Sequence, residues 1–305
     1  MVLGRVGLTG ATGMLGRHLH AALNAAGAEV VSVSRSSGGG VKTWELANWL
    51  QHQELDELFP CVRAVVHAGA LVQPAGEVDQ SHMFDANVRA CLNLGQWALE
   101  RDIPVVHISG AIVYADPYAH SQDESARLGY SGIGGFYGFS KLLAEDVLAR
   151  LCQQGLKLAL LRPTSIYGQG LDESKMVRRF LSLAAGERVI DLIEPSSDCI
   201  DLVHAADVAA ATVAVLQRQC WDNFNVSSGN PVSIRNLAQA CLEVTGRGRI
   251  SISGQTQPGY RPKTTYSLDI NRARERLGWE PAIGIHCGLD MLLRGQYLLN
   301  APTKD

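Results

Sequence analysis

The chain has 305 residues, of which 19% are charged and 46% are apolar, and its formal net charge is −3 at pH 7. This balance provides no basic field for nucleic acid or for an anionic membrane surface, so we expect neither as a partner. No apolar run approaches the roughly 20 residues that a transmembrane helix needs. The seven cysteines form no C-x-x-C pair, which is typical of reduced thiols and favours a cytoplasmic location.

Short β-rich runs alternate with helical patterns through the first two thirds of the chain, which predicts βαβ units and a parallel sheet. After about residue 162 the elements become shorter and the connections longer. We expect strands at residues 5–8, 29–34, 64–67, 105–109 and 157–161, and helices at residues 14–26, 48–58, 81–100 and 136–153.

The stretch TGATGMLGRH, residues 9–18, lies between the first expected strand and the first expected helix. In this context its glycines predict a dinucleotide-binding turn. Gly10 can take a positive φ, Gly13 lets the backbone approach a pyrophosphate, and Gly16 lets the helix close onto the strand. The helix N-terminus would then present free N–H groups to the phosphates. A glycine turn that packs a strand on a helix without a ligand is the alternative.

These patterns together predict an α/β fold, a Rossmann-type doubly wound parallel sheet with a smaller C-terminal substrate lobe. We expect the dinucleotide-binding domain to cover residues 1–162. Residues 163–305 would form most of the substrate lobe, with some segments returning to the first domain.

The end of the second expected strand, SVSRS, indicates which dinucleotide is bound. An Asp or Glu there would bind the ribose hydroxyls of NAD. Arg35 instead offers a planar cationic group suited to a 2′-phosphate, with the hydroxyls of Ser34 and Ser36 beside it. We therefore predict NADP(H) as the preferred cofactor. NAD is possible if Arg35 is only a solvated loop charge.

Further motifs follow the glycine turn along the chain. They are VVHAGA (65–70), Asn87 in FDANVRACLNL, VVHISGAIVYADP (105–117), Tyr137 and Lys141 in FYGFSK, LLRPTSIYGQG (160–170), DLVHAADVAAA (201–211) and LGWEP (277–281). In this order they resemble the motifs of the extended short-chain dehydrogenase/reductase family, also called the NAD-dependent epimerase/dehydratase family.

The resemblance implies a set of cofactor-binding residues that is spread over the first 165 residues. The set is Thr9, Gly10, Thr12, Gly13, Met14, Leu15, Ser34, Arg35, Ser36, Glu45, Leu46, His67, Ala68, Gly69, Asn87, Ile108, Tyr137, Lys141, Pro163, Thr164 and Ser165. Glu45 would occupy the acidic position that contacts the adenine.

Tyr137 and Lys141 resemble the catalytic pair of the family and lie four positions apart, which places them on one face of a helix. In the family the tyrosine exchanges a proton with the substrate oxygen while a hydride passes to or from the nicotinamide. An ammonium about 4 Å away stabilises a phenolate by about 4 kcal/mol at an effective dielectric constant near 20. An ordinary amphipathic helix that carries both residues is the alternative.

One position departs from the family pattern. The family places Ser or Thr four residues before the tyrosine of V-Y-G, where its hydroxyl binds the reacting oxygen, and here that position is Gly110. Ser109 is adjacent, but neighbours on a strand point to opposite faces, so Ser109 can substitute only at a bulge or strand end. The expected catalytic set is therefore Tyr137, Lys141 and Ser109. The substrate would be bound by Ser109, Gly110, Ala111 and Arg261.

The residue before the segment DLVH (201–204) indicates the class of substrate. Nucleotide-sugar enzymes of the family usually carry an arginine there for the diphosphate, and this chain has Ile200, although Arg261 resembles a second nucleotide-contacting arginine. We therefore favour NADPH-dependent reduction of a small carbonyl or enone, as in dihydroflavonol-reductase-like members. The alternatives are a nucleotide-sugar epimerase or dehydratase with retained NAD, and a non-catalytic NADP-sensing protein.

Two further expectations concern assembly and metals. Family members often pair through two long helices, so residues 81–100 and 139–153 predict a possible homodimer. The partly apolar faces of these helices carry Leu92, Leu94, Leu142 and Leu143, although a core role inside the monomer explains the same leucines. The histidines form no H-x-x-x-H pattern and no Cys/His cluster in the sequence, so no metal site is predicted.

Overall fold

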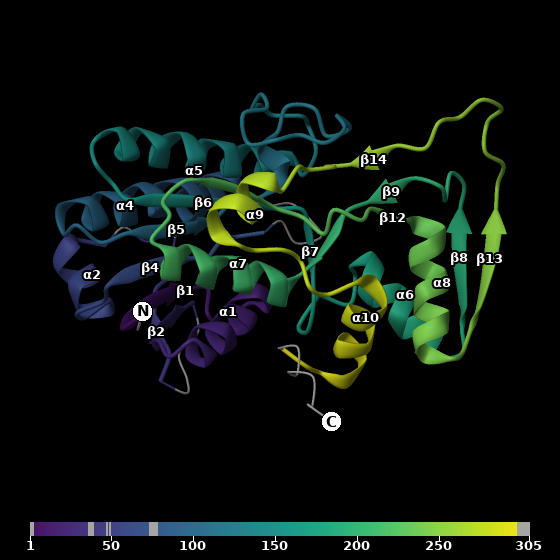
Figure 1. Cartoon of the computed structure of the whole chain (residues 1–305), viewed down its shortest axis with the longest axis horizontal. Helices are drawn as coiled ribbons and strands as arrows, with labels where there is room; N and C mark the ends of the chain where they lie inside the picture. Colours follow the sequence, from purple (N-terminus) through teal and green to yellow (C-terminus); the bar gives the residue numbers. More distant parts are fainter. Residues whose placement is uncertain (1–2, 36–39, 47, 49, 73–78, 298–305) are drawn as a thin grey trace.

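The computed structural model describes residues 3–35, 40–46, 48, 50–72 and 79–297. Seven parallel strands form its central sheet in the order β11-β6-β5-β4-β1-β2-β3 (Figure 1). The strands are β1 (Arg5–Thr9), β2 (Glu29–Ser34), β3 (Lys42–Thr43), β4 (Ala64–His67), β5 (Val105–Ile108), β6 (Leu158–Pro163) and β11 (Asn223–Val226). The chain reverses its direction of winding between β1 and β4, so ligands are expected at the carboxyl ends of these two strands.

Side-chain alternation along the buried strands creates one core on each face of the sheet. In β4, Val66 packs into the core under α1 (Met14–Ala25) and α7 (Ala205–Arg218), whereas Val65 packs into the core under the helices of the opposite face. Those helices are α2 (His52–Leu58), α4 (Ala90–Glu100) and α5 (Gly135–Gln153). Figure 1 shows α4 and α5 on one side of the sheet and α1 and α7 on the other. The expected doubly wound α/β architecture is confirmed.

The helix expected at residues 81–100 is continuous but irregular. It begins as α3 (Gln80–Phe84), where the side chain of Asp79 accepts a hydrogen bond from the Ser81 N–H at 2.9 Å. It then passes through a π-helical turn, Asp85–Arg89, before it continues as α4. Single π turns inside helices are rare and often mark functional sites.

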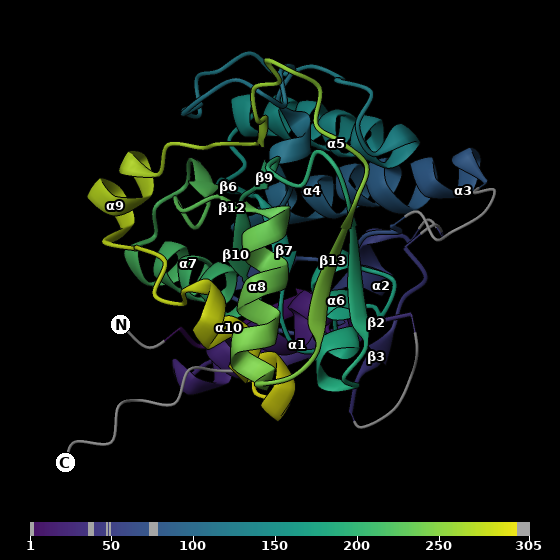
Figure 2. The ribbon, with the colours of Figure 1, turned by 90° about the vertical axis from the view of Figure 1, so that its right-hand side faces the viewer.

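The second lobe lies at one end of the central sheet and faces the viewer in Figure 2. It has its own apolar core. Helices α6 (Met176–Ala185), α8 (Ile234–Thr245) and α10 (Ile285–Arg294) pack against the parallel pair β8 (Val189–Ile193) and β13 (Arg249–Ser253). The remaining elements are β7 (Ser165–Tyr167), β9 (Cys199–Ile200), β10 (Leu202–His204), β12 (Val232–Ser233), β14 (Thr264–Thr265), α9 (Asn271–Leu277) and a short 3₁₀ turn (Ala111–Val113).

The structure corrects two expectations about the elements. The helix expected at residues 48–58 begins only at His52, because the Asn48 carbonyl accepts a hydrogen bond from the Trp44 indole N–H at 3.2 Å within a turn. Strands β3 and β11, at the two edges of the sheet, were not expected. Among the helices described, none combines the length and the apolar character needed to cross a membrane.

Candidate active site

A cavity of about 240 Å³ opens at the switch point between β1 and β4. Ten predicted cofactor residues line it: Thr9, Gly10, Thr12, Gly13, Ser34, Arg35, Glu45, Leu46, Ala68 and Gly69. Five further lining residues were not expected from the sequence: Val33, Trp44, Ala70, Leu71 and Ala86. Met14 and Leu15 open α1 directly after Gly13. Ser36 lies outside the described residues.

Each glycine of the turn has a distinct steric reason. Gly10 has φ +69°, and a Cβ there would lie 2.8 Å from the backbone of Gly69. A Cβ at Gly16 would overlap the Gly10 carbonyl oxygen, so glycine lets α1 pack closely on the turn. Gly13 is exposed, and a Cβ there would meet only the Gly10 carbonyl. Two glycines therefore close the turn, and the third leaves its outer surface open.

The N-terminus of α1 faces this open surface without a partner of its own. Gly13 is the N-cap, no side chain caps the helix, and its first turn carries no acidic residue. The free N–H groups and the positive end of the helix dipole can therefore bind an anion such as a pyrophosphate.

Polar groups from the end of β2 line the far part of the cavity. The hydroxyl of Ser34 is hydrogen-bonded to that of Thr12. Arg35 is exposed, and in the part of the chain that the structure describes no carboxylate forms an ion pair with it. The Ser34 carbonyl accepts from the Trp44 N–H at 2.9 Å, which brings Trp44 and Glu45 into the cavity wall. Among the described residues, the cavity wall therefore offers one cation, Arg35, and one carboxylate, Glu45, to a ligand.

The buried hydroxyl of Thr9 joins the ends of β1 and β4. It lies 2.7 Å from Nδ1 of His67 and accepts the N–H of Gly69 at 3.1 Å. Asn87, on the π turn, holds the next part of the same loop. Its amide accepts from the Leu71 N–H at 2.7 Å and donates to the Leu71 carbonyl and to the Ser140 hydroxyl, both at 2.9 Å. Through these hydrogen bonds, His67 and Asn87 hold the loop after β4, which forms part of the cavity wall.

Tyr137 and Lys141 lie on the first turns of α5. Tyr137 is half-buried, whereas Lys141 is buried and donates from Nζ to the Ile108 carbonyl at 2.9 Å. The Lys141 Nζ lies 6.0 Å from the centre of the Tyr137 ring. The structure thus brings together three residues from the predicted set, two on α5 and one at the carboxyl end of β5.

The next turn of α5 is fixed to the sheet by a buried ion pair. The Glu145 carboxylate binds Arg162 of β6 at 2.7 Å, and both side chains are 2% exposed. Arg162 also donates to the Tyr114 hydroxyl at 3.2 Å, and that hydroxyl donates to Asn225 of β11 at 2.6 Å. The position of α5, the helix that carries Tyr137, is therefore set by a network of Arg162 of β6, Tyr114 after the 3₁₀ turn and Asn225 of β11.

The Gly110 region leaves room for the hydroxyl that the family pattern expects. Gly110 is extended (φ 175°, ψ 158°). Apart from the two adjacent residues, the nearest neighbour of a Cβ at this position would be Ile112, 3.7 Å away. The Ser109 hydroxyl is buried and has no hydrogen-bond partner among the described residues. Ala111, the third residue of this group, is buried at the start of the 3₁₀ turn.

Other predicted residues lie apart from the cavity. Pro163 ends β6, and the Thr164 hydroxyl that follows it donates to the buried carboxylate of Asp201 at 2.8 Å. The Ser165 N–H donates to the Asp201 carbonyl oxygen at 3.2 Å. Arg261 is exposed in the connection between β13 and β14. Arg178, a second candidate cation for a diphosphate, pairs with Glu173 at 2.7 Å.

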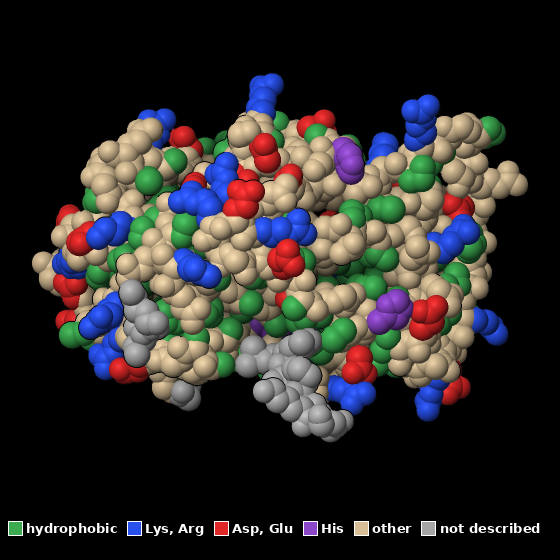
Figure 3. Space-filling view, viewed as in Figure 1, with side chains coloured by type: hydrophobic (Ala, Val, Ile, Leu, Met, Phe, Trp, Pro, Cys, Tyr) green, Lys and Arg blue, Asp and Glu red, His purple; other side chains and the backbone are tan. Residues whose placement is uncertain are grey.

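The distribution of charge on the surface and the burial of leucines on α4 and α5 concern the expected partners, a small molecule and a second copy of the chain. Figure 3 shows Lys and Arg side chains interspersed with Asp and Glu on the face in view. Of the leucines considered for a dimer, Leu94 is buried in the core, whereas Leu92, Leu142 and Leu143 are half-buried.

Comparisons with known proteins agree with this geometry. The sequence model of the NAD dependent epimerase/dehydratase family matches residues 6–227. A dTDP-4-dehydro-6-deoxy-D-allose reductase of Streptomyces bikiniensis is 30% identical over 306 residues, with 90% of each chain covered.

Two solved structures share the fold. UDP-glucose 4-epimerase of Thermus thermophilus in complex with NAD superposes with a TM-score of 0.79 at 23% identity, covering 95% of this chain and 98% of that one. UDP-glucose 4-epimerase of Thermotoga maritima with UDP-glucose gives a TM-score of 0.81 at 21% identity, with the same coverage.

Proposed function

Because the chain belongs to the NAD dependent epimerase/dehydratase family, we propose that it reduces a carbonyl group with NADPH and that Tyr137 donates the proton. The preferred substrate is a small ketone, aldehyde or enone. A relative that is 30% identical and similar in extent is named as a reductase, which supports reduction as the direction of the reaction.

The residues of the cavity fit a dinucleotide. The exposed Gly13, the uncapped N-terminus of α1 and the cation of Arg35 are complementary to a pyrophosphate and a 2′-phosphate. A bound nicotinamide would supply the hydride. The Arg35 cation supports NADPH, because it would bind the 2′-phosphate. Glu45 lies in the same cavity wall and would repel a phosphate placed near it, so the preference for NADPH requires the ribose to lie closer to Arg35 than to Glu45.

The observation that carries the proposal is the anchored pair on α5. The Ile108 carbonyl holds the Lys141 ammonium 6.0 Å from the centre of the Tyr137 ring. Tyr137 can therefore give a proton to the substrate oxygen as negative charge develops there, and Lys141 offsets the charge left on the phenol.

The substrate oxygen also needs a hydrogen-bond donor. With glycine at position 110, we propose that the Ser109 hydroxyl takes this role after rotating out of its buried position, where it has no partner to lose. Ala111 and Gly110 would form the adjacent wall. The Arg261 guanidinium, in an exposed connection, would contact a substrate only when that connection folds over the site.

The second candidate is epimerisation or dehydration of a nucleotide sugar with retained NAD. The likeness over 95% of the chain to two UDP-glucose 4-epimerases favours it. Ile200 in place of the diphosphate-binding arginine and the pairing of Arg178 with Glu173 argue against it. An NADP-sensing protein without turnover is the third candidate, and the missing hydroxyl at Gly110 favours it.

Compartment and assembly complete the proposal. All seven cysteines are free thiols, which supports a reducing, cytoplasmic location. Half-buried leucines on α4 and α5 support a homodimer through these helices.

The absorbance spectrum of the purified protein and an NADPH-oxidation assay test these alternatives. The assay panel contains small aldehydes, ketones and enones, a dTDP-linked 4-keto sugar and UDP-glucose. Reduction predicts an empty site that oxidises NADPH with a carbonyl substrate, and that loses this activity in Tyr137→Phe. A tightly retained cofactor with turnover of UDP-glucose would support the epimerase instead. Binding of NADP without turnover of any substrate would support the sensor.

A further inference from the structure

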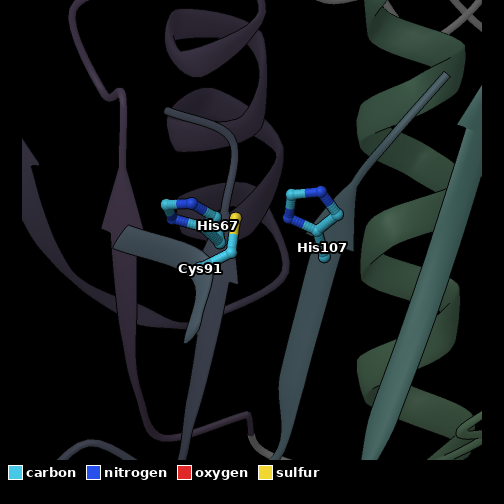
Figure 4. Close-up of side chains that lie close together, drawn as sticks. All are labelled: His67, Cys91 and His107. Atoms are coloured by element: carbon cyan, nitrogen blue, oxygen red, sulfur yellow. The ribbon is translucent and has the colours of Figure 1, made fainter. Parts of the chain in front are cut away.

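Three potential metal ligands meet between the sheet and α4, although they come from positions far apart in the sequence. His67 ends β4, His107 lies in β5, and the two residues are paired in register across the sheet. Cys91 projects toward them from α4 (Figure 4). One ligand atom from each residue lies within 4.8 Å of the other two. The histidine spacing in the sequence gave no sign of this cluster, which is a property of the sheet register.

The cluster contains unsatisfied polar atoms in the interior. Each of the three residues is 1% exposed. Nε2 of His67 and both ring nitrogens of His107 have no hydrogen-bond partner in the part of the chain that the structure describes. A buried polar atom without a partner costs about 1–3 kcal/mol. One ligand nitrogen of each ring lies within 4.8 Å of the Cys91 sulfur, and buried polar atoms of this kind are normally satisfied, which points to a ligand between the rings and the thiol.

The donor atoms are available in the forms that bind metals. Both imidazoles are buried, and burial disfavours the charged form of a ring, so each ring offers a nitrogen lone pair to a metal. Nδ1 of His67 is taken by Thr9, which directs Nε2 into the cluster. One thiol and two imidazoles form a soft donor set, which Cu(I) and Zn(II) prefer to Mg(II) or Ca(II).

Charge distinguishes the two candidate ions. The Cys91 thiol donates to the Asn87 carbonyl at 3.0 Å, and binding of a metal as the thiolate would release this proton. Zn(II) on one thiolate would leave a net positive charge in the interior, close to the buried ammonium of Lys141. Cu(I) on one thiolate is neutral. Because an unpaired buried charge is costly, the monovalent ion fits the surroundings.

We propose that His67, Cys91 and His107 form a three-coordinate binding site for Cu(I). Bonds of about 2.0–2.3 Å to nitrogen and sulfur place the donors of a trigonal site about 3.5–3.8 Å apart. The observed separations, all within 4.8 Å, require the donor atoms to move closer by at most about 1.3 Å to bind the ion. Cys91 lies two residues after the π turn, where the regular helical hydrogen bonds are interrupted, and this turn provides a place for the helix to open.

The experiment is an anaerobic competition for Cu(I) between the full-length protein and bicinchoninate, a coloured Cu(I) chelator. The exposed thiols are first removed by Cys61→Ser, Cys152→Ser and Cys287→Ser, because they would bind the ion elsewhere. In this background we compare Cys91→Ser and His107→Phe with Cys241→Ser, a buried cysteine outside the cluster. X-ray absorption at the copper edge identifies the ligands without relying on any variant.

The proposal predicts one tightly held Cu(I) per chain, with one sulfur and two imidazole ligands. Both cluster variants should weaken binding at least 100-fold, whereas Cys241→Ser should not change it. Melting curves recorded without copper identify a variant that has failed to fold. The proposal is overturned if the chain cannot compete with bicinchoninate, if Cys91→Ser retains the ion, if the absorption spectrum lacks imidazole ligands, or if Zn(II) binds at this site and Cu(I) does not.

Discussion

Replacing Gly110 by serine would restore a hydroxyl where the family pattern expects one. The backbone at this position is extended, a conformation open to any residue, so the substitution introduces no torsional strain. A Cβ would lie 3.7 Å from Cγ2 of Ile112, 3.8 Å from the Pro163 carbonyl oxygen and 4.0 Å from the Ile112 nitrogen. These are ordinary van der Waals contacts, so we expect the free energy of unfolding to change by less than about 0.5 kcal/mol.

The expected gain in rate follows from the worth of one positioned donor. Removing such a donor from a developing oxyanion typically lowers kcat by about 10²- to 10³-fold. Gly110→Ser should therefore raise kcat for NADPH-dependent carbonyl reduction by about 10²-fold, with little change in the KM for NADPH. Gly110→Ala is the matched control, because it fills the same space without a hydroxyl and should leave kcat unchanged.

Ser109→Ala tests whether the neighbouring hydroxyl acts in the unmodified protein. Because Ser109 acts only after rotating out of its buried position, it supplies a small part of the donor effect, so steady-state kinetics should show a loss of about 10-fold in kcat when Ser109 is changed alone. The same change in a Gly110→Ser background should cost much less, because the new hydroxyl replaces the old one. If Gly110→Ser and Gly110→Ala are equally active, with unfolding curves like that of the unmodified chain, the reasoning about a missing donor is refuted.

Four other outcomes can be measured on the same preparations. Tyr137→Phe should lower kcat by about 10²- to 10⁴-fold while the Kd for NADPH, measured by fluorescence, stays the same; a large change in Kd with normal kcat would contradict the role of the phenol. Arg35→Ser should raise the KM for NADPH about 10-fold and leave that for NADH unchanged, since a charge-assisted hydrogen bond contributes about 1.5–3 kcal/mol; equal effects on both cofactors would refute 2′-phosphate binding. Arg162→Met should lower the free energy of unfolding in urea by about 3–5 kcal/mol because it leaves the Glu145 carboxylate buried and unpaired, and the double variant Arg162→Met/Glu145→Leu should recover most of the loss. Hydrogen bonds, first from Thr256 and then from Ser196, lower the pKa of Glu194 from 4.5 to about 2. Its contribution to stability is therefore complete above about pH 4.5 and is lost as the pH falls toward 2. Melting temperatures of Glu194→Gln should accordingly depend less on pH in that window than those of the unmodified chain.

The sequence predicted the parts of the fold that depend on local pattern. Continuous apolar runs such as residues 64–67 indicated buried strands, and the glycine turn between a strand and a helix indicated the switch point of the sheet. Strand β3 has only two residues, and β11 lies far along the chain after α7. Neither carries enough periodicity to be recognised, since their pairing is set by the edges of the sheet that they meet.

The candidate site was predictable to the extent that single motifs line it. Ten of the predicted residues lie on the cavity wall, because the turn and the loops after β2 and β4 each carry their ligand-facing residues in sequence. Trp44 was missed because it enters the wall through the pairing of β3 with β2. Cys91 meets His107 only through the packing of α4 on the sheet, and no spacing in the sequence encodes that contact.

Strand β11 has a consequence for synthesis on the ribosome. It pairs with β6 along Leu160–Pro163 and supplies Asn225, which accepts the hydrogen bond of the buried Tyr114 hydroxyl. Some 60 residues separate the two strands, so at about 5–20 residues per second the edge of β6 is uncovered for several seconds of translation. A fragment truncated at residue 162 would never acquire this strand. Production of the nucleotide-binding half by itself would therefore require grafting residues 222–226 onto it.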